Sequence, residues 1–202
     1  MKKRTAFIGS ILSLISLGQP LLIKTSVVLS STAVMLFVPE KVNAGSADFY
    51  LKKLRVIYRN KGEESKTIFY ANELLQIDPF NYEGYWFRAY AKVEMGLFED
   101  GIKDYKKSIE LGDEDSQTYT NIGFAYLELG DNYRAISYFN KSIEMFSNSM
   151  QVYINRSIAK ENIGDIKGAC LDARKAVSLG DNDPKNKNWI KENCSSNFKY
   201  EY

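Results

Sequence analysis

The side chains that most often perform chemistry in proteins are scarce in this sequence. It contains no histidine, so the commonest general base and the commonest metal ligand are both missing. Carboxylates gather at Glu99-Asp100 and Asp113-Glu114-Asp115, but both groups stand beside glycine-containing turns, and we interpret them as solvated loop charge. No glycine-rich phosphate loop, nucleophile elbow or metal-spaced cysteine set is present. We therefore expect no catalytic, metal or cofactor site.

The two cysteines, Cys170 and Cys194, could form a disulfide or remain as two thiols. They are the only cysteines in the chain of 202 residues. A disulfide is expected if the protein is exported, because exported proteins meet an oxidising compartment. Two buried thiols are the alternative, because Cys170 occupies a place where isoleucine recurs elsewhere in the chain. On the chain-entropy model, a disulfide closing a loop of this length adds about 3 kcal/mol to stability.

Residues 1–44 have the pattern of an export signal. They begin with three basic residues after Met1, contain two apolar runs (Ala6–Ile15 and Leu21–Val38), and end in Val-Asn-Ala. We expect cleavage after Ala44 and a mature domain outside the cytoplasm, in a periplasm, thylakoid lumen or envelope. The alternative is an uncut membrane anchor at residues 21–38, which is near the roughly 20 residues that span a bilayer. An organelle transit peptide also fits the scarcity of acidic residues.

The basic net charge of the chain belongs to this leader. The formal charge is +2, but the first 44 residues hold five basic residues and one acidic residue. The remainder therefore keeps 22 of the 27 basic and 24 of the 25 acidic residues, a net charge of −2. A domain with a net negative charge lacks the positive potential that attracts a polyanion, so we expect no nucleic acid partner.

The elements that would position any functional residues follow a repeat of 34 residues. Glycines recur at this spacing, and so do apolar residues at three other places. Four copies run without a gap, at 48–81, 82–115, 116–149 and 150–183. In each copy, apolar spacing predicts two helices of about 13 residues on either side of a glycine that ends the first helix. Such short helices must lean on neighbouring copies. The recurring glycines are Gly62, Gly96, Gly130 and Gly164.

This pattern resembles the tetratricopeptide repeat family over residues 48–194. The third copy matches the family pattern best, through Tyr119, Ile122, Gly123, Tyr126 and Phe139. The resemblance implies an all-α fold, a right-handed α-solenoid of helix-turn-helix repeats. The first copy is degenerate, residues 184–194 are expected to form a capping helix, and residues 195–202 a flexible tail. In copies two and four, arginine and lysine replace two pattern residues, and we expect their stems to pack while their charges reach water.

The resemblance also implies a binding surface, because the first helices of such repeats line a groove that holds peptide segments of other proteins. Large apolar residues stand at groove places of copies two and three, where the two-helix packing does not require them. An asparagine recurs in copies three and four, where it could bond a peptide backbone. The lysine and asparagine clamp of the family's chaperone-tail binders cannot be assembled. The predicted partner-binding residues are Trp86, Phe87, Tyr90, Asn121, Phe124 and Asn155, whereas Tyr85, Tyr105, Tyr119, Phe139 and Tyr153 are assigned to the core.

We therefore predict a non-enzymatic interaction scaffold without a cofactor. The acids Glu83, Glu94 and Glu128 around the apolar groove residues favour a partner protein or peptide whose apolar segment has basic flanks. The resemblance suggests assembly of a membrane or envelope complex. One alternative is a permanent accessory subunit of a membrane-associated complex, with its groove buried. Another is a carboxylate-dependent hydrolase, for which Glu94 and Glu128 are the one groove pair at matching places.

Overall fold

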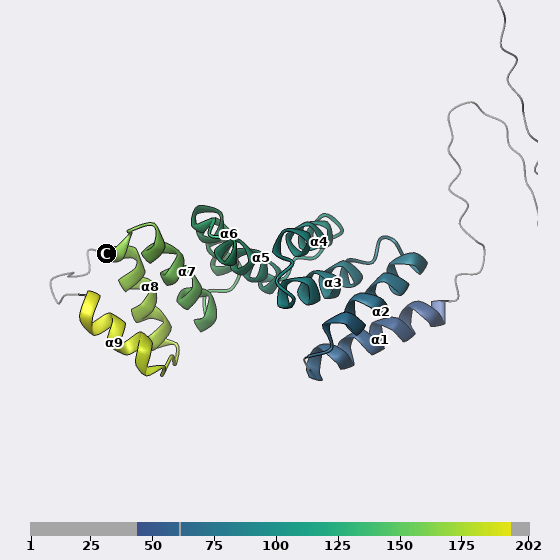
Figure 1. The fold of residues 1–202 in the computed structure, drawn as a ribbon, viewed down its shortest axis with the longest axis horizontal. Helices are drawn as coiled ribbons and strands as arrows, with labels where there is room; N and C mark the ends of the chain where they lie inside the picture. Colours follow the sequence, from purple (N-terminus) through teal and green to yellow (C-terminus); the bar gives the residue numbers. More distant parts are fainter. Residues whose placement is uncertain (1–43, 61, 195–202) are drawn as a thin grey trace, which may run out of the picture. The chain divides into compact units, whose positions relative to one another are not determined.

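The computed structural model describes residues 44–60 and 62–194, and every regular element in that part of the chain is an α-helix (Figure 1). The predicted all-α class is confirmed. The predictions for the leader, including the anchor at 21–38, and for the tail at 195–202 concern residues outside the described ones. The described helices are α1 (Ala44–Asn60), α2 (Glu64–Ile77), α3 (Tyr82–Glu94), α4 (Phe98–Glu110), α5 (Ser116–Glu128), α6 (Asn132–Met145), α7 (Met150–Asn162), α8 (Ile166–Ser178) and α9 (Pro184–Asn193).

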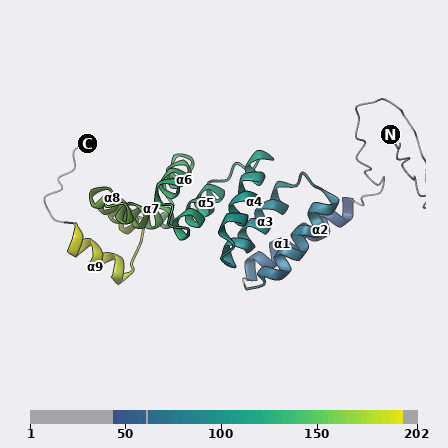
Figure 2. The same ribbon diagram turned by 45° about the horizontal axis from the view of Figure 1, so that its top comes forward.

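Each helix packs against the next one along the chain, which gives a row of helix pairs (Figures 1 and 2). The first helices of successive pairs also contact one another, α1 with α3, α3 with α5, and α5 with α7. Within the described residues, no such contact joins the second helices α2, α4, α6 and α8. The first helices therefore share one continuous surface. None of the described helices is both long enough and apolar enough to cross a bilayer.

The turn inside each pair depends on its glycine. Gly130, between α5 and α6, has a φ of 77°, and Gly96, between α3 and α4, has a φ of 78°. A residue with a Cβ rarely adopts such a left-handed conformation, so glycine ends the first helix at low cost. After Gly130, the Asp131 side chain accepts a hydrogen bond from the Arg134 backbone N–H and caps α6. The predicted role of these glycines is confirmed.

The short helices are stabilised by a core that continues from one repeat to the next. One cluster joins Tyr105 of α4, Ile122 of α5, Phe139 of α6 and Val152 of α7, all fully buried. Gly123 allows α5 and α6 to approach closely, because a Cβ built there would lie 2.6 Å from Phe139 Cε1. Tyr105, Phe139 and Tyr153 are buried as predicted, whereas Tyr85 and Tyr119 are only half-buried.

The first repeat departs from the family pattern in a way that the structure explains. Arg55 stands where a small residue is expected, and Ala71 stands where the third repeat has Phe139. The small residue has thus moved to the second helix, where Ala71 is fully buried. The Arg55 side chain reaches outward and donates to Glu83 of α3 at 2.8 Å. Helix α1 also begins at Ala44, ahead of residue 48, where we placed the start of this repeat.

Helix α9 packs against α8 at the end of the last repeat. Pro184 occupies its first turn, and the Asp183 side chain caps it by accepting from the Lys185 backbone N–H. A disulfide joins Cys170 of α8 to Cys194, with 5.6 Å between their Cα atoms. No residue within α9 is buried, so this helix is held by fewer apolar contacts than the internal helices.

Candidate functional site

Among the described residues, the largest group of aromatic side chains lies where α1, α3 and α4 meet. Trp86 stacks parallel to Tyr90 with 5.9 Å between the ring centroids, and Tyr58 of α1 meets both rings edge-on, at 5.2 Å from Trp86 and 4.8 Å from Tyr90. Tyr105 of α4 lies edge-on beneath Trp86 at 6.1 Å. Such edge-on and offset pairs are the favoured geometries of aromatic rings. The cluster is therefore a rigid surface rather than a loose set of side chains.

A hydrogen-bond relay fixes the Trp86 ring further. Its Nε1–H donates to Thr118 Oγ1 at 2.8 Å, and the Thr118 hydroxyl donates to Asp113 Oδ2 at 2.6 Å. Asp113 also accepts from Ser108 Oγ and from the Asp115 backbone N–H. We interpreted Asp113 as solvated loop charge, and that interpretation is wrong, because this carboxylate is 4% exposed and holds the turn between α4 and α5.

The structure divides the predicted binding residues into two groups. Phe87 is 5% exposed and packs with Leu54 and Leu74 in the core between repeats one and two. Its assignment to a binding surface is therefore corrected, because its ring fills the junction that α1 and α2 leave open. Trp86, Tyr90 and Phe124 remain partly exposed along the edge of the larger core cluster.

We also assumed that the helix packing is complete without the aromatic residues at groove places, and for Trp86 that assumption is wrong. Its ring contacts four other rings, and its N–H bonds a neighbouring repeat. A substitution of Trp86 would therefore change both the surface and the stability.

The two recurring asparagines differ in what they offer to a ligand. Each accepts from a glutamine one turn earlier in its helix, Asn121 from Gln117 and Asn155 from Gln151. The Asn121 amide also donates to the Tyr105 hydroxyl at 2.8 Å. Phenylalanine replaces that tyrosine in the next repeat, so the Nδ2 of Asn155 has no hydroxyl to bond there. This Nδ2 has no hydrogen-bond partner among the described residues, and Asn155 as a whole is 7% exposed.

A cavity of about 440 Å³ opens beside the aromatic cluster, between α1, α3 and the turn after α4. Aromatic rings form its inner walls, and carboxylates form its rim. The sequence interpretation missed much of this site, because Tyr58 and Tyr82 are not at groove places of their helices and the acids lie in a turn. Its lining residues are Tyr58, Tyr82, Glu83, Trp86, Phe87, Asp113, Glu114 and Asp115.

The charge around this cavity is negative. Burial raises the pKa of Tyr58, and the carboxylates of Glu94 and Asp115 raise it further. The pKa of Tyr90 is raised in the same way, first by burial and then by Glu94. Both shifts mean that a negatively charged tyrosinate is unfavourable at this cluster. The same field would attract a cation.

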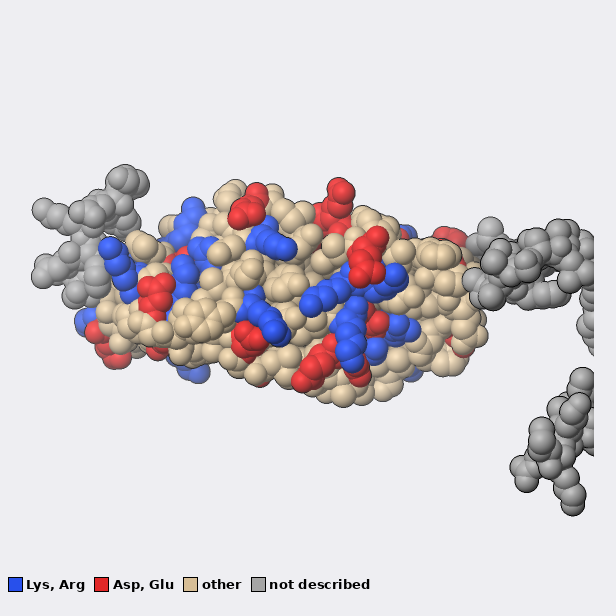
Figure 3. All heavy atoms as spheres, turned by 90° about the horizontal axis from the view of Figure 1, so that it is seen from above, with Lys and Arg blue, Asp and Glu red and all other residues tan. Residues whose placement is uncertain are grey.

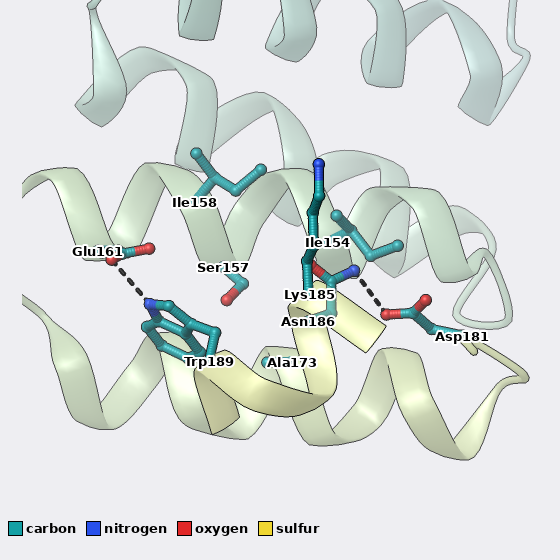
Figure 4. A pocket seen from close by; sticks show the side chains of 9 residues that line it. All are labelled: Ile154, Ser157, Ile158, Glu161, Ala173, Asp181, Lys185, Asn186 and Trp189. Carbon is teal, nitrogen blue, oxygen red and sulfur yellow. Dashed lines mark hydrogen bonds between the residues drawn. The ribbon is translucent and has the colours of Figure 1, made fainter. Parts of the chain in front are cut away.

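A second, smaller cavity of about 190 Å³ lies between α7 and α9 (Figure 4). Ile154 and Ile158 of α7 face Trp189 of α9 across it, and Trp189 donates to Glu161 at 2.8 Å. This cavity depends on the position of α9. The sequence predicted a capping helix at 184–194 but not this cavity, because the cavity forms only where α9 packs beside α7.

The charged side chains seen from above the view of Figure 1 are mixed (Figure 3). Lysine and arginine alternate with aspartate and glutamate, and a large part of that face is uncharged. Among the described residues, no group of His, Cys, Asp and Glu is arranged to hold a metal ion.

Comparison with known proteins identifies the fold. Residues 116–149 match the tetratricopeptide repeat family model. The chain is similar in structure to MamA residues 41 to the end from Desulfovibrio magneticus RS-1, with 14% identity, a TM-score of 0.65, and coverage of 72% of this chain and 81% of that one. No curated protein sequence matches the chain significantly.

Two further solved structures share the fold. YrrB, described as a TPR protein with an unusual peptide-binding site, has 14% identity and a TM-score of 0.58, and the match covers 65% of this chain and 67% of that one. The first TPR of Spaghetti (RPAP3), bound to the HSP90 peptide SRMEEVD, has 18% identity and a TM-score of 0.52, with coverage of 55% and 88%. The fold is therefore an all-α solenoid of the tetratricopeptide type, and the third repeat carries the sequence match.

Proposed function

We propose that this protein is a non-enzymatic scaffold that holds an apolar peptide segment with basic flanks on the surface shared by its first helices. The observation that carries the proposal is the aromatic cluster of Tyr58, Trp86 and Tyr90, which is fixed by ring contacts and a hydrogen bond and still partly exposed. Rigid aromatic anchors lose little entropy when they bind, so they dominate the energetics of interfaces.

The similar structures support a peptide as the partner. YrrB has a peptide-binding site, and the Spaghetti domain holds the acidic peptide SRMEEVD. In this chain, Glu94 is exposed beside the aromatic cluster, and Glu114 and Asp115 are exposed at the neighbouring cavity. An acidic peptide would be repelled there, whereas a segment with basic flanks would be attracted. Asn155 is the better candidate of the two asparagines for bonding the peptide backbone, because its Nδ2 has no partner among the described residues, whereas that of Asn121 already bonds Tyr105.

Synthetic peptides test this proposal directly. Peptides with one apolar core and arginine, serine or glutamate flanks are titrated against the full chain by fluorescence anisotropy. We expect the arginine-flanked peptide to bind most tightly, and Phe124→Ala to weaken its binding by about 1–2 kcal/mol. Phe80→Ala is the matched control, because Phe80 is 76% exposed but lies in the turn between α2 and α3. Equal binding of all three peptides, or equal effects of the two substitutions, would contradict the proposal.

We further infer that the scaffold works outside the cytoplasm, in the assembly of a membrane or envelope complex. The basic and apolar pattern of residues 1–44 supports export. The bond between Cys170 and Cys194 also supports it, because disulfides persist in oxidising compartments. N-terminal sequencing of the native protein tests the inference, and we expect a mature chain that begins at Gly45. Recovery of an uncut chain from the soluble cytoplasm would overturn it.

A further inference from the structure

We propose that the cavity between α1, α3 and the turn after α4 receives an arginine side chain of the bound peptide. This inference rests on the proposed function and specifies it, because it assigns one basic residue of the peptide to one pocket. It depends on three observations, which are the size of the cavity, the aromatic rings on its walls, and carboxylates on its rim that have no cationic partner.

The walls suit a planar cation. The cavity of about 440 Å³ has room for a guanidinium group and its alkyl stem. Tyr82 is 43% exposed at its mouth, and Trp86 is held in place by its bond to Thr118. A guanidinium group is attracted to the face of an aromatic ring and stacks on it, which an ammonium group cannot do as well.

The rim supplies negative charge, of which only that of Glu83 is neutralised within the described part of the chain. Glu83 is already paired with Arg55, which donates to both of its carboxylate oxygens. Asp113 accepts three hydrogen bonds, but all of them come from uncharged donors. Glu114 and Asp115 are exposed and take part in no ion pair among the described residues. A cation entering the cavity would therefore meet unpaired carboxylates.

Arginine fits this arrangement better than lysine does. Its guanidinium group presents several donors in one plane, so it can contact two carboxylates while it lies against a ring. Lysine carries the same charge as a compact and strongly hydrated point, and it loses more hydration when it enters an aromatic pocket. We therefore expect arginine to be preferred to lysine and both to be preferred to citrulline, which has the shape of arginine without its charge.

The two tryptophans of the chain allow a test that does not need the natural partner. The probe is N-acetyl-arginine-methylamide, titrated into the full chain, and the readout is the pair of indole N–H signals in a heteronuclear NMR spectrum. We expect the Trp86 signal to shift and the Trp189 signal, which belongs to the cavity at α9, to stay in place. The citrulline analogue should shift neither. Equal shifts of both signals, or equal effects of the arginine and citrulline probes, would overturn the inference.

Charge-removing variants separate this pocket from the groove as a whole. Glu114→Gln with Asp115→Asn removes two charges, and asparagine keeps the helix cap that Asp115 provides for α5. We expect the affinity for an arginine-flanked peptide to fall about five-fold. Asp183→Asn is the matched control, because Asp183 occupies the same place one repeat pair later and caps α9. An unchanged affinity in the double variant would overturn the pocket.

The peptides also distinguish the failure of this inference from the failure of the proposed function. If replacing arginine with citrulline leaves peptide binding unchanged, the pocket is wrong and the scaffold proposal survives. If none of the peptides binds while the arginine probe still shifts the Trp86 signal, the pocket survives and the peptide groove is wrong.

Discussion

Repeats two and four hold their helices together by charge at places where repeats one and three carry aromatic residues, and in repeat three these rings stack on one another. In repeat four, the Asp172 carboxylate accepts from Arg156 at 2.6 Å and from Lys160 at 2.8 Å. Repeat two repeats this arrangement with Asp104 at its centre. Repeat three has Ile122, Tyr126 and Tyr138 instead, and the two tyrosine rings stack with 5.5 Å between their centroids. One helix-pair geometry therefore accepts two chemically different solutions.

The difference extends to the junctions between repeats. Arg88 of repeat two and Arg156 of repeat four each donate a further hydrogen bond to an asparagine of the preceding repeat, Asn72 or Asn140. The other junctions reverse the direction of this contact. Lys106 of repeat two donates forward to the Tyr126 hydroxyl, and the corresponding residue of repeat four, Arg174, donates forward to the Cys194 carbonyl.

The two kinds of repeat therefore alternate, and the structural unit is a pair of repeats with a period of two copies. Helices α2 and α3, within the first pair, are in more extensive contact than α4 and α5, which join the first pair to the second. We expected the basic residues at these places to send their charges into water. That expectation is wrong for Arg156, whose side chain is 16% exposed and bonds Asp172.

The largest effect is expected from breaking a charged centre. Asp172→Ala leaves Arg156 and Lys160 close together without a counter-charge, and their side chains are only 16% and 18% exposed. Removing one partner of such a buried pair typically costs about 3–5 kcal/mol. We expect a loss of about 3 kcal/mol in the free energy of unfolding, measured by urea titration with circular dichroism. Asp100→Ala, in the exposed pair with Lys103, is the control and should cost less than about 0.5 kcal/mol.

A result of the opposite kind would sharpen the comparison. If Asp172→Ala costs no more than Asp100→Ala, the charged centres contribute little to stability, and the aromatic repeats hold the solenoid. The same titration on Tyr138→Ala then measures the aromatic solution directly, because Tyr138 occupies the place of Asp172 in repeat three.

An intermediate effect is expected at the end of the second pair, where a capping helix stands in place of a fifth repeat. Cys194→Ser removes the bond to Cys170, which closes a segment with a sequence separation of 24. On the chain-entropy model, losing this bond lowers the free energy of unfolding by about 3 kcal/mol at most. The noncovalent contacts of α9 remain in the variant and keep the last repeat partly stabilised. We expect hydrogen exchange to rise in α8 and α9, while α3 and α4 stay protected.

Ending the chain at residue 183 should raise exchange in α8 further, because it also removes the packing of α9 against α8. Unchanged protection of residues 166–178 in both variants would show that the last repeat does not need its cap. The accompanying control measures the intact mass of the chain without substitutions after alkylation in the absence of reductant. Two alkyl labels on that chain would mean that both thiols are free.

The helix pairs could be predicted from the sequence because the same pattern of glycines and apolar residues occurs in four copies. Glycine positions, the small residue Gly123 and the large residue Phe139 each correspond to a single local requirement. The functional surface was less predictable, because the same aromatic residue type serves both core and surface. Trp86 and Phe87 are adjacent in sequence, yet Phe87 fills the junction between repeats one and two, while Trp86 remains partly exposed.

Residues that act between repeats were missed for a related reason. The hydrogen bonds from Trp86 to Thr118 and from Thr118 to Asp113 connect two repeats, and no local sequence pattern predicts them. The alternation of repeats is visible in the sequence as arginine and lysine in copies two and four. The structural role of these basic residues cannot be predicted without their partners, Asp104 and Asp172 on the second helices, which reach them only after the helices pack.

The smallest effect concerns the junction between the two pairs, where Tyr105 accepts from Asn121 and the corresponding residue of repeat three is Phe139. Tyr105→Phe makes this junction resemble the next one, and it removes one hydrogen bond between neutral groups. We expect a loss of about 1 kcal/mol in the free energy of unfolding near neutral pH. Asn121→Ala should cost slightly more, because it also removes the bond from Gln117. The double variant should cost little more than Asn121→Ala alone, because the bond that Tyr105→Phe removes is already lost.

The pH dependence of the free energy of unfolding tests whether the Tyr105 hydroxyl is shielded from solvent in the folded state. Burial raises the pKa of Tyr105 well above its ordinary value of 10.0, so the folded state keeps the phenol neutral after the unfolded state begins to ionise. Stability from this group is therefore fully present below about pH 10 and is lost as the pH rises toward the folded-state pKa. The Tyr105→Phe variant has no such loss, so its deficit should shrink between about pH 8 and about pH 11. A deficit that stays constant over that range would mean that the Tyr105 hydroxyl ionises equally in both states, and that solvent reaches it at the junction of the two repeat pairs.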